Sequence, residues 1–422
     1  MERKIYDNYL TILEAELLPA MGCTEPIAVA FAAAKARAVL GKMPERMDVY
    51  CSGNIVKNVK GVVVPNSGGQ LGIDVAAVLG VVGGREDLEL EVVNSVTQEQ
   101  IEKTKELVKS GMCDCHLVEG EENLYIRAEV FAGEDKALVE LKTKHTHISR
   151  IEKNGEILFA QDDIETSSQG DKSQLNLKDI YEFANTVDVE DVRGILERQL
   201  KYNKAISEEG LKNPWGAQVG RTLLEVHGDS EWKVRAKAAA AAGSDARMSG
   251  CALPVVINSG SGNQGITVSM PILEYANEVK CSEEKLLRAL TLANLLSLHQ
   301  KRYIGNLSAY CGAVSAGCSA ACGIAYIDGA SLEVIGHTII NAICNVGGMV
   351  CDGAKSSCAA KIASAVEAGL LGYEMAKRGN NFKPGEGMVV EDMEQTIQNI
   401  GRMGRVGMKG TDVEILNIML GK

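Results

Sequence analysis

The chain has 422 residues, of which 45% are apolar and 24% charged, and its net charge is −12. This length allows two or three domains with a sizeable core, and the composition is that of a soluble globular protein. The acidic balance argues against nucleic acid as a partner, because phosphate binding requires a basic surface. Aromatic residues make up only 4%, whereas glycine occurs 44 times, so packing must rely on small side chains and close backbone contact.

The N-terminal segment carries scattered charges and lacks the apolar region of a signal peptide. No stretch has the uninterrupted apolar length that is needed to span a bilayer. We therefore expect a cytoplasmic protein that does not bind membranes. In that reducing compartment, the 12 cysteines are expected to include metal ligands or catalytic thiols rather than a disulfide framework.

The apolar spacing predicts an amphipathic helix over residues 3–20, and the alanine-rich segment 25–40 predicts a second helix. From about residue 45 the pattern changes. Residues 47–66 are predicted as strands, residues 98–111 as a charged helix, and residues 124–161 as an antiparallel meander with a hairpin turn at KNGE. From residue 177 onward the chain is predicted to be mostly helical, after a polar linker at 162–176.

These elements predict an α+β fold in which a mainly helical catalytic domain is discontinuous. Residues 1–43 and 167–422 would form the helical domain, and residues 44–166 would form a smaller α/β domain inserted into it. The inserted domain carries no ligand motif. We expect it to cover the site or to mediate assembly, for which a homodimer is the simplest form.

Two segments near helix N-termini contain candidate functional residues. MGCTEP places Cys23 where the helix dipole and free N–H groups would lower the pKa of its thiol; the alternative is a small buried turn residue. In NSGSGNQG, residues 258–265, exposed N–H groups and polar side chains could cradle a carboxylate or phosphate. This segment lacks the lysine of a P-loop and the setting of a dinucleotide fingerprint, so a structural turn is its alternative.

Two further segments are rich in cysteine. Cys311, Cys318 and Cys322 have helical spacing, which is usually explained by apolar packing. The loop CDGAKSSC is different, because it can turn the sulfurs of Cys351 and Cys358 inward. There is no CxxC pair, which disfavours zinc-ribbon and thioredoxin-type sites.

Three other features receive structural interpretations. Cys344 is predicted to belong to the core, and CDCH, residues 113–116, to be an ordinary strand or loop. His145 and His147 lie two residues apart in a predicted strand, and we expect a surface pair rather than metal ligands.

Four segments, taken together and in this order, resemble the iron–sulfur L-cysteine desulfidases. They are GCTEPIA, NSGSGNQGI, IGNLSAYCGAVSAGC and NVGGMVCDGAKSSCAAKI. The resemblance covers nearly the whole chain. The helical part also resembles, more distantly, the iron–sulfur L-serine dehydratase alpha chain, whose first ligand segment is similar to YCGAVSAGC. The resemblance implies a [4Fe–4S] cluster that is held by three cysteines and leaves one iron open to substrate, without pyridoxal phosphate.

The resemblance also implies roles for individual residues. The implied cluster ligands are Cys311, Cys351 and Cys358, with Cys318 and Cys322 as substitutes for Cys311. Cys23 takes the place of a cysteine that moves a proton or caps the fourth iron when substrate is absent. The loop residues that would orient the carboxylate of a small amino-acid substrate are Ser259, Gly260, Ser261, Gly262, Asn263 and Gln264.

The implied reaction is β-elimination from L-cysteine to sulfide, ammonia and pyruvate, in which a Cys23 thiolate would remove the Cα proton. The preference for sulfide as leaving group comes from the resemblance alone. One alternative is an L-serine dehydratase with the same mechanism. An alternative of another class is a non-catalytic iron–sulfur sensor of redox state or iron, in which protein ligands fill all four iron positions.

Overall fold

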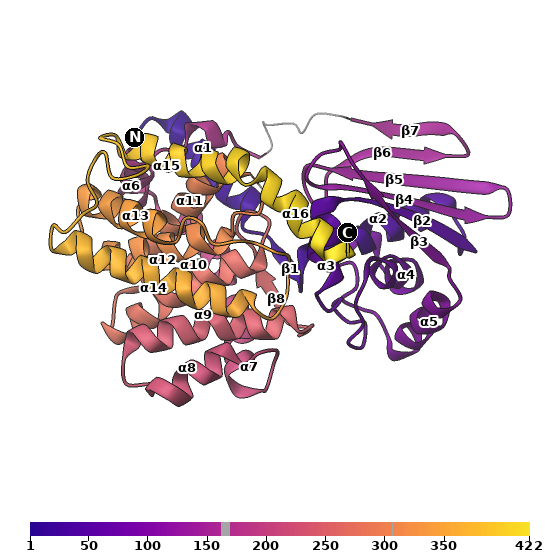
Figure 1. The fold of residues 1–422 in the computed structure, drawn as a ribbon, viewed down its shortest axis with the longest axis horizontal. Helices are drawn as coiled ribbons and strands as arrows, with labels where there is room; N and C mark the ends of the chain where they lie inside the picture. Colours follow the sequence, from indigo (N-terminus) through magenta and orange to yellow (C-terminus); the bar gives the residue numbers. More distant parts are fainter. Residues whose placement is uncertain (162–168, 306) are drawn as a thin grey trace.

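A computed structural model describes residues 1–161, 169–305 and 307–422 of the chain. It has a body of packed helices on one side and a six-stranded sheet with its own helices on the other (Figure 1). The predicted α+β class with mostly helical content is therefore confirmed. Residues 162–168 of the predicted linker and Asn306 of the third resembling segment lie outside the described residues. Within the described part of the chain, no helix combines the length and apolarity needed to cross a bilayer.

The six-stranded sheet has the order β3-β2-β4-β5-β6-β7. Its strands are β2 (Arg46–Ser52), β3 (Cys113–Val118), β4 (Tyr125–Ala132), β5 (Asp135–Lys142), β6 (Ile148–Lys153) and β7 (Glu156–Ala160). Only β2 and β3 are parallel, and β4 to β7 form the predicted antiparallel meander. Asn154 and Gly155 both have positive φ, 51° and 85°, as the two central residues of a type I′ hairpin turn require. The predicted meander and its turn are confirmed.

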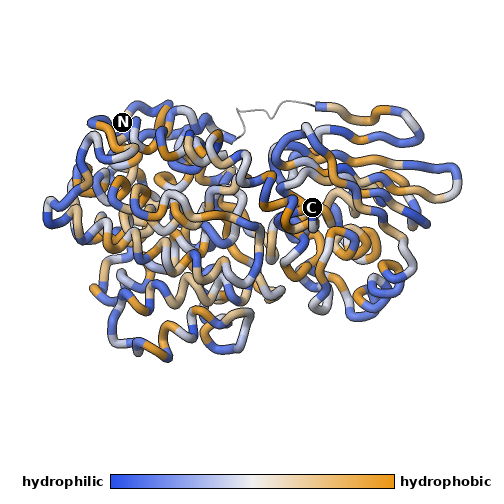
Figure 2. The backbone as a smooth tube through the Cα atoms, viewed as in Figure 1, coloured by the Kyte–Doolittle hydropathy of each residue, from blue (hydrophilic) through white to orange (hydrophobic). Residues whose placement is uncertain are grey.

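Helices cover one side of this sheet. They are α2 (Thr24–Leu40), α3 (Gly53–Lys60), α4 (Ile73–Gly83) and α5 (Gln98–Lys109), with a short 3-10 helix η1 (Glu86–Glu91). In Figure 2, α5 at the outer edge is largely hydrophilic, whereas α4 beside it is hydrophobic. The prediction of strands over residues 53–60 is wrong, because Ile55 and Val59 lie one helical turn apart and are both buried on one face of α3.

Helix α2 packs against β4, β5 and α4 and so lies with the sheet. The predicted boundary at residue 44 implied that it packs with the helical body. The sequence of α2 gives no indication of its partner, because nearly all of its side chains are small, apolar and buried. Close approach to α4 depends on Gly80, where a Cβ atom would lie 2.2 Å from the carbonyl oxygen of Ala30. The division of the chain into two domains remains a prediction.

The helical body contains α1 and the helices that follow the sheet. These are α1 (Arg3–Glu16), α6 (Leu177–Thr186), α7 (Val189–Lys212), α8 (Val219–His227), α9 (Trp232–Met248), α10 (Gly262–Glu278), α11 (Glu283–Ile304), α12 (Gly312–Ile327), α13 (Leu332–Val346), α14 (Cys358–Lys377) and α15 (Met393–Arg402). The central helix α12 is almost completely buried and packs on α10, α11, α13 and α14. A Cβ atom at Gly317 would lie 2.7 Å from the backbone of Ala365, so this glycine permits α12 and α14 to touch.

Two connections join the helical body to the part with the sheet. The short strand β1 (Pro19–Met21) pairs with β8 (Pro254–Val256), and the Ile257 amide donates to the carbonyl of Leu18 over 2.9 Å. At the other end of the chain, a π-helical turn η4 (Met403–Gly407) leads into α16 (Lys409–Leu420), which packs on α3. The first connection brings the start of α2 beside the start of α10, and the second fixes α3 beside the loop that holds Cys351 (Figure 1).

Candidate functional site

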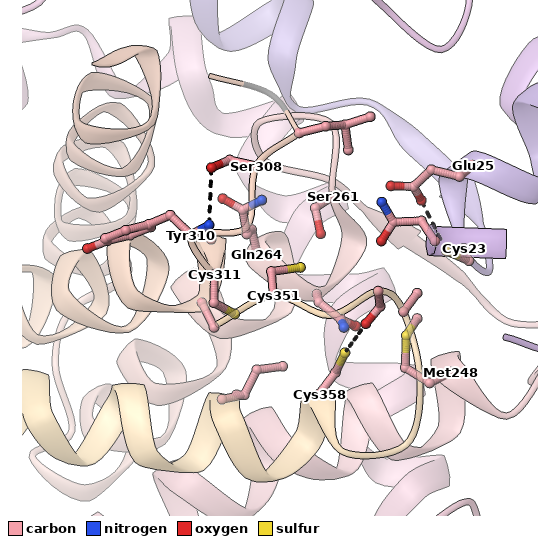
Figure 3. Close-up of a pocket in the computed structure, with 18 of the residues that line it drawn as sticks. Cys23, Glu25, Met248, Ser261, Gln264, Ser308, Tyr310, Cys311, Cys351 and Cys358 are labelled. Carbon is pink, nitrogen blue, oxygen red and sulfur yellow. Dashed lines mark hydrogen bonds between the residues drawn. The ribbon is translucent and has the colours of Figure 1, made fainter. Parts of the chain in front are cut away.

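A cavity of about 100 Å³ lies where the N-termini of α2, α10, α12 and α14 meet. Cys23, Ser261 and Cys311 are the N-cap residues of α2, α10 and α12, and Cys358 is the first residue of α14. All four line the cavity (Figure 3). Because each helix start carries free N–H groups and a positive partial charge, the cavity favours anions such as thiolates and carboxylates.

The sulfurs of Cys311, Cys351 and Cys358 line this one cavity, although these residues are up to 47 positions apart in the chain (358 − 311). A short antiparallel bridge between Tyr310 and Val350 sets the first two side by side. In it, the Cys311 amide donates to the carbonyl of Met349 over 3.0 Å and the Cys351 amide to that of Ala309 over 2.6 Å. The Cys358 thiol donates to the carbonyl of Gly353 within the same loop, over 3.7 Å. The structure thus brings the three cysteines of the predicted ligand set together (Figure 3).

The environment of these thiols favours a negative charge on Cys351. A hydrogen bond from the Cys311 thiol lowers the pKa of Cys351 to about 6 against the effect of burial, and the charges of Lys57 and Lys301 lower it further. The same hydrogen bond, together with burial, raises the pKa of Cys311. Burial also raises the pKa of Cys358. One thiolate is therefore available at neutral pH, and two lysines stand near it to offset the charge.

This donor set fits an iron–sulfur cluster better than a single metal ion. Among the residues described, no group of three or more His, Cys, Asp or Glu side chains surrounds a point at which one ion could bind. The cysteine ligands of a cluster lie farther apart than the ligands of a single ion, because each thiolate binds a different iron atom. Three thiols with nearby lysines and helix N-termini supply the soft ligands and positive field that an anionic cluster needs.

The other cysteines of the helical body lie outside the cavity. Cys318 and Cys322 are fully buried in α12, and their sulfurs face the carbonyls of Ile339 and Ile335 on α13, at 3.9 Å and 3.8 Å. The structure therefore does not place them as substitutes for Cys311. Cys344 is half-buried in α13 and does not line the cavity either.

The thiol of Cys23 donates a hydrogen bond to Oε2 of Glu25 over 3.1 Å. Burial and the negative charge of Glu25 raise the pKa of Cys23 well above its usual value. The expectation that the helix dipole lowers this pKa is therefore wrong for the structure, because burial beside a carboxylate outweighs the dipole. Burial and the Glu25 carboxylate therefore favour the neutral thiol at Cys23.

Glu25 is a site residue that the sequence analysis missed. Burial alone would raise the pKa of its carboxyl, but a protonated His145, the hydrogen bond from Cys23 and the charge of Arg247 lower it. Burial lowers the pKa of His145 itself, so at neutral pH the bond from Cys23 and the charge of Arg247 keep Glu25 ionised. Glu25 is thus held as a carboxylate and can accept a proton. The available signal was an acidic residue in the first turn of a helix, which is a common feature and does not by itself indicate a site.

The expectation that His145 belongs to a surface pair is also wrong. His145 is buried in the connection between β5 and β6, whereas His147 is half-buried. A Cβ atom on Gly260 would lie 3.2 Å from Cε1 of His145, so the connection folds directly over the 259–260 turn. Only the tertiary arrangement determines that this histidine points inward, toward Glu25.

The loop over residues 258–265 begins with a tight turn. Asn258 and Ser261 exchange backbone hydrogen bonds of 3.1 Å and 3.0 Å, and Ser259 and Gly260 between them have φ of 52° and 74°. Of the six predicted substrate-binding residues, the main cavity is lined by Ser261, Asn263 and Gln264. Ser259 and Gly260 instead line a smaller cavity of about 60 Å³ together with His145. The sixth residue, Gly262, packs against Arg247.

Two buried cations, Arg247 and Lys301, also line the cavity, and sequence reasoning missed both. Arg247 lies near the end of α9, and Lys301 lies near the end of α11. Burial lowers the pKa of Lys301 to about 8, although the nearby thiols of Cys351 and Cys311 oppose this effect. Its ammonium donates to the carbonyl of Gly305 over 2.6 Å. No local motif marks either residue, because both belong to ordinary helices.

Comparison with known proteins identifies the family of this chain. The family model described as serine dehydratase alpha chain matches residues 87–417, which include α12, the 351–358 loop and α14. A UPF0597 protein of Desulfitobacterium hafniense (strain Y51) is 50% identical over 424 residues, covering 100% of this chain and 98% of that protein. A UPF0597 protein of Lachnoclostridium phytofermentans is 51% identical over 418 residues, covering 99% and 100%.

A third relative, a UPF0597 protein of Finegoldia magna, is 48% identical over 419 residues and covers 98% of this chain and 100% of its own length. These full-length relatives also include the segment around Cys23, which precedes the residues matched by the family model. The resemblance inferred from the four segments is confirmed at the level of the family. The chain belongs to the serine dehydratase alpha chain family.

Proposed function

We propose that the chain is an iron–sulfur-dependent lyase that eliminates the β-substituent of a small L-amino acid. L-cysteine is the proposed substrate, and sulfide, ammonia and pyruvate are the products. The observation that carries the proposal is the meeting of Cys311, Cys351 and Cys358 at one cavity that also holds a proton-accepting pair and buried cations. Membership of the serine dehydratase alpha chain family supports a lyase of this kind.

In this proposal, Cys311, Cys351 and Cys358 would hold a [4Fe–4S] cluster. When bound, the cluster supplies a Lewis-acidic iron that stabilises negative charge on the leaving atom. Lys57 and Lys301 offset the charge of the thiolates. Ser261, Asn263 and Gln264 border the space that remains for substrate. The proposal uses no pyridoxal phosphate.

Cys23 and Glu25 are proposed to remove the Cα proton. The Cα–H and Cβ–S bonds of L-cysteine break, a Cα=Cβ double bond forms, and sulfide leaves with its electron pair. Glu25 is an ionised carboxylate that holds the hydrogen of the Cys23 thiol, so it can take up that proton while Cys23 receives the one from Cα. The 2-aminoacrylate then tautomerises to an imine, and water hydrolyses it to pyruvate and ammonia.

The second candidate is an L-serine dehydratase, in which hydroxide leaves instead of sulfide. It is favoured by the description of the matching family, serine dehydratase alpha chain. Both candidates use the same residues, and only turnover distinguishes them. A non-catalytic iron–sulfur sensor is the remaining alternative, in which Cys23 would occupy the fourth iron position.

The test is anaerobic reconstitution with iron and sulfide, followed by measurement of bound iron, sulfide release and pyruvate formation from L-cysteine and L-serine. The variants C311A, C351A and C358A should each lose bound iron and reduce turnover by about 100-fold or more. C344A is the matched control, because this half-buried cysteine lies outside the cavity and its loss should leave iron content unchanged.

Each outcome of this test has one meaning. Faster turnover of L-serine than of L-cysteine would replace the desulfidase by the dehydratase. A stable cluster without turnover of either amino acid would favour the sensor. Full iron content in all three cavity variants would contradict the ligand assignment.

A further inference from the structure

We infer that Arg247 binds the α-carboxylate of the substrate and so selects free α-amino acids over their esters and amides; this inference rests on the proposed function. The proposed cluster ligands account for the thiols of the cavity, and Cys23 and Glu25 account for the proton step. Neither uses the guanidinium of Arg247, which lines the same cavity.

Arg247 is a buried cation with few partners. Its side chain is 2% exposed, and Nη1 donates to Oδ1 of Asn263 over 3.1 Å. Nε is buried and finds no hydrogen-bond partner in the described part of the chain. Among the described residues, Asn263 is the side chain that bonds to Arg247, and the carboxylate of Glu25 acts on it only through its charge. A buried guanidinium with one neutral partner is costly unless a ligand supplies the missing charge.

The position of Arg247 suits a carboxylate. Its side chain lies against the first turn of α10, where a Cβ atom on Gly262 would be 2.4 Å from Nε. Gly262 therefore leaves room for the guanidinium beside the free N–H groups of a 17-residue helix. A planar guanidinium and a helix N-terminus both bind carboxylates, the first through paired N–H donors. Together they form a receptor for one carboxylate at the side of the cavity near Asn263.

The other cations have different tasks. The ammonium of Lys57 is paired with Asp412 and also donates to the carbonyl of Cys351 over 3.2 Å. Lys301 donates to the carbonyl of Gly305 and faces the thiols of Cys311 and Cys351. Both lysines therefore lie by the thiols of Cys311 and Cys351, whereas the charge of Arg247 acts on Cys23 and Glu25.

This placement defines the class of substrate. An α-carboxylate at Arg247 puts Cα near Cys23 and Glu25 and directs the β-substituent toward the three cysteines. Esters and amides, which lack the negative charge, should bind poorly.

The experiment compares L-alanine with L-alaninamide, two unreactive probes that differ in the carboxylate, by calorimetry on anaerobically reconstituted protein. The wild-type protein should bind L-alanine more tightly than L-alaninamide. R247Q should weaken binding of L-alanine by about 100-fold and abolish the difference between the probes, because the charged hydrogen-bonded partner is lost. R247K keeps the charge but loses the planar guanidinium. Its affinity for L-alanine should therefore lie between those of the wild-type protein and R247Q. Iron content should be unchanged in both variants.

R198Q is the matched control. Arg198 is a half-buried arginine outside the cavity whose Nε is also unpartnered and whose Nη2 donates to the carbonyl of Leu17. Its replacement should cost similar stability without changing the preference for L-alanine. A preference for L-alanine that survives in R247Q, or a wild-type protein that binds neither probe, would overturn the inference. Absence of turnover with L-cysteine and L-serine would overturn only the proposed function, because the binding comparison needs no reaction.

Discussion

Cys23 lies at the N-terminus of α2, where the helix dipole favours a thiolate, and yet its thiol hydrogen is held by Glu25. Burial and the carboxylate determine its protonation more strongly than the dipole does. As a result, Cys23 cannot act as a base unless its proton is transferred to Glu25 first. The two residues are therefore best regarded as one proton-handling unit.

This coupling predicts the pH dependence of alkylation at Cys23 in the cluster-free protein. Glu25 raises the pKa of Cys23, so removing its charge in E25Q should lower that pKa, and the thiolate should form at lower pH. In the wild-type protein, the alkylation rate of Cys23 should stay low at pH values at which an ordinary thiol already reacts. In E25Q the rate should begin to rise at lower pH. Mass spectrometry of the peptide that contains Cys23 measures the rate.

E14Q is the control for this prediction, because Glu14 is exposed and on the outside of α1. It should leave the alkylation profile of Cys23 unchanged. Identical profiles for the wild-type protein and E25Q would mean that Glu25 does not control the thiol.

Lys57 and Asp412 show how elements far apart in the chain support the site. Lys57 of α3 is buried, with 1% of its surface exposed. Its ammonium forms an ion pair with Asp412 of α16 and donates a hydrogen bond to the carbonyl of Cys351. The C-terminal helix thus fixes α3, and α3 fixes the loop that carries Cys351 and Cys358, two of the three proposed ligand cysteines. An uncompensated charge at Lys57 would disturb this chain of contacts.

We therefore predict that D412N destabilises the protein by about 1–3 kcal/mol, which is less than for a fully buried pair because Asp412 is partly exposed. Denaturant unfolding measures the loss. Hydrogen exchange should also become faster in residues 351–358, since the ammonium of Lys57 no longer fixes this loop. D114N, a change of an exposed aspartate on β3, should stay within about 0.5 kcal/mol of the wild-type protein. Unchanged exchange in the loop would show that α16 does not support it.

At the level of elements, the sequence was informative where the apolar pattern has one clear period. The meander of β4 to β7 and the long helices follow from alternation and from helical spacing. The pattern misled at α3, where β-branched residues suggested strands although Ile55 and Val59 have helical spacing. For α2 the pattern predicts a helix but not its partner, because every face is apolar.

The molecule as a whole consists of two parts that share one continuous apolar core. Buried residues of α2, α4 and the sheet belong to the same cluster as those of α10 to α14. The cavity lies at the junction, with Cys23 contributed from the side of the sheet and Cys311, Cys351 and Cys358 from the helical body. The cytoplasmic location, the homodimer and the absence of nucleic-acid binding stay predictions from the sequence.

Because the core is continuous, we predict that the two parts unfold in one transition. Tryptophan fluorescence reports on the helical body, where Trp215 and Trp232 lie, and labelling of the buried thiol of Cys51 reports on the sheet. The two probes should give the same midpoint in denaturant. Two separated midpoints would show that the parts unfold independently and would support the predicted domain division.

The sequence by itself determined the α+β class, most of the elements, the family and the set of candidate cysteines. These follow from local spacing and from ordered motifs, which persist whatever the tertiary arrangement. Only the tertiary structure decided which thiols meet, that Cys318 and Cys322 turn away, that Arg247 faces the cavity and that His145 lines the smaller cavity. The reason is physical: the charge state of a thiol and the role of a buried arginine depend on neighbours that are distant in the chain, and no local pattern records them.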